Sequence, residues 1–104
     1  MREYIYVLKL IPRLYEEENW TKDDQDIVGQ HFTRLKNYCD KGQVMTAGKT
    51  DRDDEKGFGI VIFKEENDEK AEAFKNEDPA VMHGIMTAEV FPYRTALGIN
   101  GRSR

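Results

Sequence analysis

Apolar residues recur along the chain with two different spacings. In four stretches they alternate with polar residues or form short runs rich in β-branched and aromatic side chains, which is typical of strands. In two longer stretches they recur every three or four residues, which is typical of amphipathic helices. The pattern predicts strands over residues 3–11, 43–50, 58–65 and 85–94, and helices over residues 22–41 and 67–77.

Residues that begin or end helices support these boundaries. The segment "TKDD" offers a capping box, in which the Thr21 side chain accepts from the Asp24 amide and the Asp24 carboxylate reaches back. Gly42 is placed to end the helix that begins there. A short extra turn over residues 78–84 also ends in a glycine and separates the second helix from the last strand.

The six main elements follow in the order strand, helix, strand, strand, helix, strand, which is the split βαβ order of ferredoxin-like folds. We therefore predict an α+β fold of βαββαβ order. Its four-stranded antiparallel sheet carries two helices on one face. We expect a single domain over residues 1–94 and a flexible C-terminal tail over residues 95–104.

Both faces of the predicted sheet are apolar. In the first strand Tyr6 and Leu8 point to one face, whereas Ile5 and Val7 point to the other. Two helices can cover only one of these faces, and a monomer rarely exposes a contiguous apolar patch above roughly a few hundred Å². We therefore expect a homodimer that packs one open sheet face against the other.

Composition narrows the possible functions. The chain has 104 residues, a formal net charge of −4 and a single cysteine, Cys39. Negative charge disfavours binding to nucleic acid, and no apolar run approaches the roughly 20 residues that span a bilayer. A single cysteine cannot form an intrachain disulfide, which favours the cytoplasm. Phosphate-loop, nucleophile-elbow and dinucleotide motifs are absent, so we expect no cofactor, nucleic acid or membrane partner.

His31 raises the main functional question. It lies in the middle of the apolar side of the helix predicted over residues 22–41, one turn from Ile27 and from Leu35, whereas Arg34 belongs to the opposite, polar side. A buried charged imidazole is costly unless it is paired. His31 is therefore either a core histidine that donates one hydrogen bond to a carbonyl, or a general acid–base group.

Asp78 is the candidate partner of His31. Because Pro79 follows it, Asp78 has the form of a helix N-cap with proline at the first helical position. A capping carboxylate is held in place and can still orient an imidazole. Spacing along the chain alone does not show whether the two residues meet.

An ordered set of short motifs resembles the YCII-related family. That family has a histidine early in the first helix, a leucine one turn later, a glycine before the second strand and Ala-Gly at its end. Asp-Pro and then glycine precede the last strand. In this chain these positions are His31, Leu35, Gly42, Ala47–Gly48, Asp78–Pro79 and Gly84. The chain departs from the pattern at Lys49, where many members have proline, and in its longer connection over residues 12–30.

The resemblance implies a dimeric α/β-barrel type of ferredoxin-like fold and a pocket with a catalytic dyad of His31 and Asp78. Most members have no assigned reaction, but a related member acts on a chlorinated hydroxyquinone. We therefore expect a small lyase, isomerase or hydrolase in which Asp78 orients His31, and His31 moves a proton on a small oxygenated or cyclic substrate. Arg13 and Lys49, near strand ends, are candidate substrate-binding cations, although a solvated surface cation is the plainer explanation for each.

Two functions from other classes stay open. The same pocket can belong to a module that binds a metabolite without converting it, or the domain can serve only dimerisation or association with another enzyme as an accessory. His31, His83 and Asp78 together form a known type of metal ligand set, but nothing in the sequence brings them together and we expect no metal. Trp20 is either a hydrophobic staple for the first helix or a lid over the pocket.

Overall fold

The computed structural model describes residues 1–98. Strands and helices fall close to the predicted ranges, and two 3-10 turns fill the connection after the first strand. The strands are β1 (Arg2–Leu10), β2 (Val44–Lys49), β3 (Gly59–Glu65) and β4 (Met86–Tyr93). The helices are η1 (Pro12–Tyr15), η2 (Glu17–Asn19), α1 (Lys22–Asp40), α2 (Asp68–Asn76) and α3 (Pro79–Met82).

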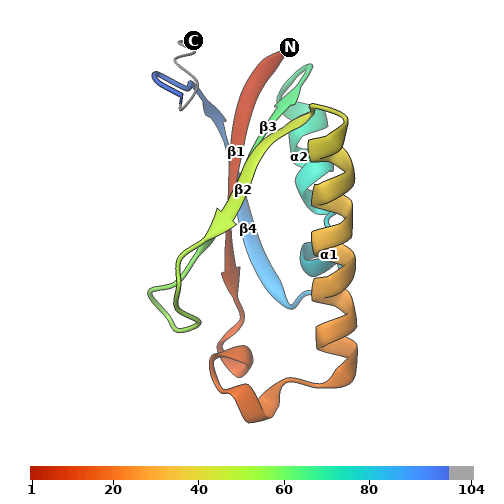
Figure 1. The fold of residues 1–104 in the computed structure, drawn as a ribbon, viewed down its shortest axis with the longest axis vertical. Coiled ribbons are helices and arrows are strands. Elements are labelled where there is room, and N and C mark those ends of the chain that lie inside the picture. Colours follow the sequence, from red (N-terminus) through yellow and green to blue (C-terminus); the bar gives the residue numbers. More distant parts are fainter. Residues whose placement is uncertain (99–104) are drawn as a thin grey trace.

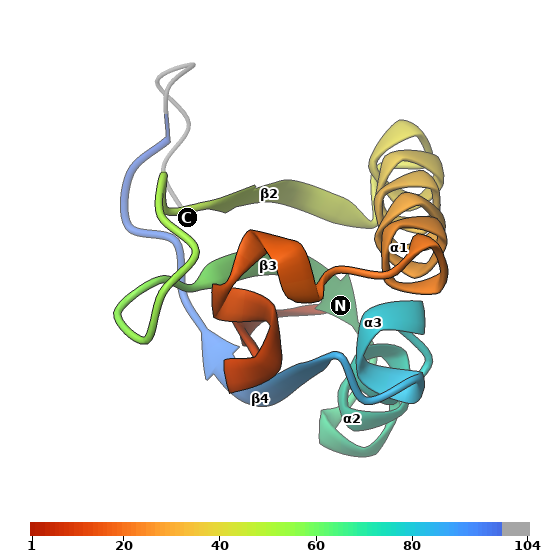
Figure 2. The same cartoon turned by 90° about the horizontal axis from the view of Figure 1, so that it is seen from below.

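The strands form one four-stranded sheet in the order β2-β3-β1-β4, and all neighbouring strands are antiparallel. All three α-helices lie on the same face of this sheet, and the opposite face carries no helix (Figures 1 and 2). The 3-10 turns lie beyond the end of β1 and lead the chain round to the start of α1 (Figure 1). The predicted α+β, ferredoxin-like fold is therefore confirmed.

Local side-chain bonds explain where the helices begin. Thr21 Oγ1 accepts from the Asp24 amide at 3.1 Å and Asp24 Oδ2 accepts from the Thr21 amide at 2.9 Å, so the predicted capping box is present. Asn67 caps α2 by accepting from the Lys70 amide at 2.9 Å. Gly42 ends the first helix with a φ of 84°, a left-handed conformation that favours glycine.

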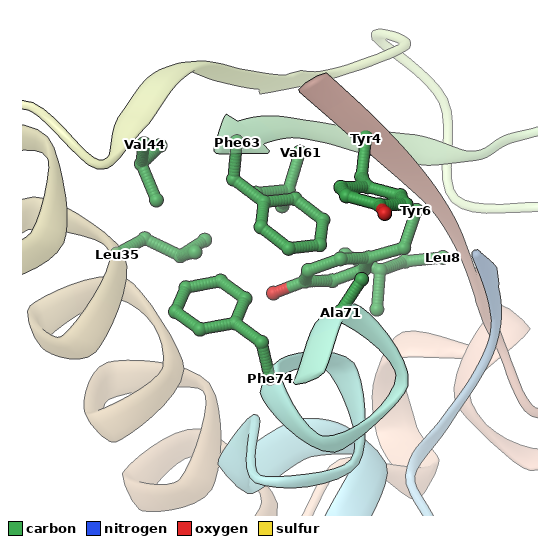
Figure 3. Close-up of a cluster of buried hydrophobic side chains, with 9 residues drawn as sticks. All are labelled: Tyr4, Tyr6, Leu8, Leu35, Val44, Val61, Phe63, Ala71 and Phe74. Atoms are coloured by element: carbon green, nitrogen blue, oxygen red, sulfur yellow. The ribbon is translucent and has the colours of Figure 1, made fainter. Parts of the chain in front are cut away.

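The hydrophobic core lies between the sheet and the helices (Figure 3). Aromatic rings dominate it: Phe63 stacks on Phe74 with centroids 4.6 Å apart, and Tyr6 meets Phe63 edge-on at 5.6 Å. This cluster contains Tyr4, Tyr6, Leu8, Leu35, Val44, Val61, Phe63, Ala71 and Phe74. The helices therefore cover the face of β1 that carries Tyr4, Tyr6 and Leu8.

The opposite sheet face also carries apolar side chains, as the alternation predicts. The register places Ile5 beside Ile62 on one side and beside Phe91 on the other, and Val7 beside Ile60. Phe91 is 42% exposed. We call Ile5, Val7, Ile60, Ile62 and Phe91 the open-face patch. No helix within residues 1–98 covers it, and none of those helices is long and apolar enough to cross a membrane.

Three residues of α1 differ from the prediction. Phe32 and Cys39 belong to its apolar side but are exposed, Phe32 by 66%, because this side of α1 borders a cavity there instead of the sheet. Arg34 belongs to the polar side, yet its side chain is only 14% exposed. An amphipathic pattern therefore predicts which side of the helix faces inward. It does not show whether a given residue on that side meets the sheet or a cavity.

The predicted C-terminal tail starts at Thr95. The Thr95 amide and hydroxyl donate to Glu3 Oε1 at 3.2 and 2.5 Å, so the chain stays attached to β1 just beyond the predicted boundary. The rest of the tail prediction falls largely on residues 99–104, which lie outside the described residues.

Candidate functional site

His31 and Asp78 are hydrogen-bonded to each other. His31 Nδ1 lies 2.7 Å from Oδ1 and 2.9 Å from Oδ2 of Asp78. His31 projects from the middle of α1, and Asp78 is the N-cap of α3. The Asp78 side chain is 0% exposed and that of His31 is 13% exposed. Two residues 47 positions apart thus form a nearly buried pair, a proximity that the sequence left open.

Two further donors hold the Asp78 carboxylate in place. The Ala80 amide donates to Oδ1 at 3.0 Å, which is the N-cap bond that the Asp-Pro sequence predicts. The Tyr6 hydroxyl of β1 donates to Oδ2 at 2.6 Å. Both carboxylate oxygens therefore accept hydrogen bonds from fixed groups, and the orientation that Asp78 offers to His31 is set from two sides.

These contacts decide the charge of Asp78. Burial raises the pKa of its carboxyl, but the hydrogen bonds from His31 and Tyr6, the charge of His31 and the Ala80 amide together outweigh burial. The net pKa of Asp78 lies below its ordinary value, so the group is a carboxylate at neutral pH. For Tyr6, burial and the neighbouring Asp78 raise the pKa of the hydroxyl far above its ordinary value, so it stays protonated and donates.

The ionised carboxylate fixes the tautomer of a neutral His31. A carboxylate only accepts, so Nδ1 must carry the proton and Nε2 is left with a lone pair. Within the part of the chain that the structure describes, Nε2 of His31 has no hydrogen-bond partner. This arrangement suits a general base, because the basic nitrogen faces away from the group that orients the ring.

A cavity of about 560 Å³ adjoins His31. Its walls come from α1 and the residue Trp20 before it, from the sheet, and from the loop between β2 and β3. The lining residues are Leu8, Leu10, Trp20, Val28, His31, Phe32, Leu35, Lys36, Cys39, Val44, Ala47, Gly48, Lys49, Arg52, Asp53, Asp54, Gly57, Phe58, Gly59, Ile60, Val61 and Met86. Most of these side chains are apolar, and the charged ones other than His31 and Lys36 come from Lys49 and the loop after it.

The two candidate cations lie in different places. Lys49 lines the cavity, and its Nζ is 2.8 Å from Asp53 Oδ1. Arg13 does not line the cavity; its guanidinium donates to both oxygens of Asp24 at 2.8 and 3.0 Å and to the Asn19 carbonyl at 2.9 Å. Arg13 thus ties the η1–η2 connection to the start of α1. Its suggested role in substrate binding has no supporting contact.

Other candidates are also placed by the structure. Trp20 lines the cavity while its Nε1 donates to the Leu14 carbonyl at 3.0 Å, so it forms part of the cavity wall. His83 is exposed and does not join His31 and Asp78. Among residues 1–98, no three His, Cys, Asp or Glu side chains are grouped so that they could hold a metal ion.

Tyr6 is a member of this site that the sequence pattern does not predict. The alternation places Tyr6 on the same face of the first strand as Leu8, but the partner of its hydroxyl lies 72 residues away. A signal was present: a tyrosine in the centre of a core strand needs a partner for its hydroxyl. This expectation implies that the Tyr6 hydroxyl has a hydrogen-bond partner, but it does not identify Asp78 as that partner.

Comparison with known proteins agrees with this fold. Residues 9–94 match the YCII-related domain. The fold resembles 5-chloro-2-hydroxyhydroquinone dehydrochlorinase from Burkholderia phenoliruptrix, solved in complex with 2,5-dihydroxybenzoquinone. The TM-score is 0.66 at 18% sequence identity, and the alignment covers 96% of this chain and 99% of the other. No curated protein matches the sequence.

Proposed function

The chain belongs to the family of YCII-related domains, and on that basis we propose that it is a small-molecule enzyme whose His31–Asp78 dyad moves a proton. The reaction class is that of a lyase, isomerase or hydrolase. The observation that carries the proposal is the Nδ1–carboxylate contact of 2.7 Å, which leaves Nε2 of His31 without a protein partner among residues 1–98. Two further features support an acid–base role: the Asp78 carboxylate that orients His31 is held by Tyr6 and the Ala80 amide, and His31 lines a cavity.

The dyad would act in two steps. His31 Nε2 takes a proton from a carbon or oxygen of the substrate, and the Asp78 carboxylate stabilises the imidazolium that forms. The proton then returns to another substrate atom in an isomerisation, or to the leaving group or solvent in an elimination. Asp78 keeps its negative charge throughout, because its donors favour the carboxylate in both states of His31.

The cavity supports a small, largely apolar substrate that carries oxygen atoms. A volume of about 560 Å³ lies within the usual range for pockets that bind small molecules. The similar dehydrochlorinase acts on a hydroxylated, chlorinated ring, and we carry over only the general class of a small oxygenated ring. Lys49 is one of the cations that line the cavity, and it would neutralise an enolate or phenolate as it forms, at the expense of its bond to Asp53.

Hydrogen–deuterium exchange at carbon provides the test. A panel of small cyclic enolisable ketones in D2O is followed by proton NMR with the wild-type chain. We expect accelerated exchange of at least one compound, no acceleration by His31→Asn, and a loss of roughly 10²- to 10⁴-fold in Asp78→Asn. His83→Asn is the matched control, since His83 is exposed and does not line the cavity. Equal rates for wild type and His31→Asn would refute the proposed role.

The second candidate is a module that binds a small molecule without converting it. The mostly apolar cavity favours it, because such a pocket can hold a ring without any acid–base chemistry. Binding of 2,5-dihydroxybenzoquinone, measured by calorimetry, separates the two. Equal affinity in wild type and His31→Asn, with no exchange catalysed by either, favours the binding module.

We further propose that the chain is a homodimer of the α/β-barrel type, joined through the open-face patch. No helix within residues 1–98 covers that patch, and Phe91 is 42% exposed on it. A single cysteine, Cys39, which is exposed and unpaired, supports a reducing compartment and hence the cytoplasm as the location. Neither proposal depends on the identity of the substrate.

A further inference from the structure

Arg34 lies one turn after His31 on α1, on the side that the hydrophobic pattern assigns to solvent. Its side chain is nevertheless only 14% exposed. The guanidinium carbon sits 4.3 Å from the centroid of the Phe74 ring and 5.2 Å from that of Tyr38. A cation placed over aromatic rings is stabilised by the ring quadrupoles, and more so where it is shielded from water. Arg34 is therefore fixed in position and does not act as a mobile surface charge.

The same guanidinium is bonded to the segment that carries Asp78. Arg34 Nη2 donates to the Phe74 carbonyl at 2.9 Å and lies 3.9 Å from Glu77 Oε1. Phe74 is in the last turn of α2, where carbonyls lack partners within the helix. In a continuing helix the Asp78 amide would bond to the Phe74 carbonyl, but it donates instead to Lys75 at 3.1 Å. Arg34 thus supplies the donor that the Phe74 carbonyl lacks where α2 ends.

We propose that Arg34 is a positioning residue for the dyad: it clamps the junction between α2 and α3, and with it Asp78, against the helix that carries His31. The inference rests on the proposed function in that it concerns the same His31–Asp78 pair. The inference adds Arg34, which makes no hydrogen bond to the His31 ring or to the Asp78 carboxylate. The clamp explains how two groups on separate helices keep a contact of 2.7 Å.

The chemistry of this position requires arginine. The guanidinium carbon lies over the Phe74 ring while Nη2 donates to the Phe74 carbonyl and lies near Glu77, an arrangement that the planar, multi-donor guanidinium suits. A lysine ammonium keeps the charge but cannot stack and donate from one plane. The charge of Arg34 also reaches Tyr6, whose pKa it lowers against the larger effect of burial, so the clamp lies close to the whole network.

The test reads the tautomer of neutral His31 by nitrogen NMR in the full chain. In the wild type we expect the Nδ1–H form. In Arg34→Lys we expect the ratio of Nδ1–H to Nε2–H to fall by roughly tenfold, the equivalent of one ordinary hydrogen bond. Lys41→Gln is the matched control, because Lys41 also lies 5.2 Å from the Tyr38 ring but makes no bond to the α2–α3 junction. An unchanged ratio in Arg34→Lys overturns the inference.

Two additions separate the possible failures. If Asp78→Asn leaves the tautomer ratio as in the wild type, the dyad and the proposed function fail. If Asp78→Asn changes the ratio but Arg34→Lys does not, only the role of Arg34 fails. Should Arg34→Lys not fold, the wild type decides: the Arg34 guanidinium protons must exchange with water far more slowly than those of Arg2, whose side chain is 71% exposed. Equal exchange rates overturn the clamp.

Discussion

The Tyr6 hydroxyl and Asp78 Oδ2 are 2.6 Å apart in the core, although the residues are separated by 72 positions. Tyr6 is 0% exposed, and so is Asp78. The bond joins the central strand β1 to the first turn of α3, and the same carboxylate binds His31 from α1. The buried Asp78 carboxylate therefore connects β1, α1 and α3. The same two oxygens stabilise the fold and orient His31 in the proposed reaction.

Tyr6→Phe should destabilise the fold without creating a cavity. The variant keeps the ring against Phe63 but removes a hydrogen bond to a buried carboxylate, a loss of about 1.5–3 kcal/mol in the free energy of unfolding. Urea unfolding measures it. Tyr4→Phe is the matched control, because the Tyr4 hydroxyl bonds to Asp68, whose side chain is 71% exposed, and we expect a smaller loss. Equal losses in the two variants would contradict the special role of the Tyr6 bond.

Much of this fold could be predicted because local chemistry determined it. The capping box at Thr21 predicts the first residue of α1, and strand alternation divides the side chains of β1 between the two sheet faces. The pairing of Tyr6 with Asp78 could not be predicted, since any buried acceptor satisfies a phenol. The inward position of Arg34 depends on two rings and a carbonyl from other parts of the chain, which the pattern of one helix does not contain.

The exposure of Phe32 shows a second limit of sequence patterns. A stripe of apolar residues predicts a buried helix face, but an enzyme or binding protein also needs apolar walls that are open to a ligand. Phe32 and His31 follow each other in sequence and both line the cavity, yet Phe32 is 66% exposed. Hydrophobicity alone does not distinguish a core position from a cavity wall.

Acid should weaken the fold through Asp78. Its pKa is lowered in the folded chain, against about 3.9 when unfolded, so the unfolded chain binds more protons as the pH falls through this range. The stability that Asp78 contributes is therefore present above the unfolded pKa and is lost as the pH falls towards the folded pKa. We expect the free energy of unfolding to decrease as the pH falls below about 5, and to decrease less steeply in Asp78→Asn.

The comparison of slopes controls for the lower starting stability of that variant. Asp24 also has a lowered pKa, chiefly through its hydrogen bond from Arg13, and it remains in Asp78→Asn. The slope should therefore shrink and not vanish. Identical slopes in chemical denaturation across the pH series would mean that Asp78 does not contribute to acid sensitivity.

Arg13→Gln should affect stability and leave ligand binding intact. Its guanidinium makes a two-pronged bond to Asp24, which is itself part of the capping box of α1, and it does not line the cavity. We expect a lower melting temperature, a rise in the pKa of Asp24 and an unchanged affinity for 2,5-dihydroxybenzoquinone. A weakened affinity with an unchanged melting temperature would support a role of Arg13 in substrate binding.

Lys49→Gln provides the contrasting variant. Lys49 lines the cavity, and its ammonium is bonded to the exposed Asp53, so its loss should change the melting temperature little. Affinity for an anionic ring should fall by roughly tenfold, as for one lost charge-assisted hydrogen bond. Arg13→Gln should thus lower the melting temperature but not the affinity, whereas Lys49→Gln should lower the affinity but not the melting temperature.

The open-face patch should govern oligomeric state. Ile5 lies on the central strand β1, between Ile62 on β3 and Phe91 on β4, so a charge there would fall in the middle of any sheet-to-sheet contact. We expect the wild type to sediment as a dimer and Ile5→Lys as a monomer. Met82→Lys, which replaces a methionine that is 61% exposed on α3, is the matched control and should stay dimeric. A wild type that sediments as a monomer at micromolar concentration would contradict the dimer, and the open-face patch would then need another partner.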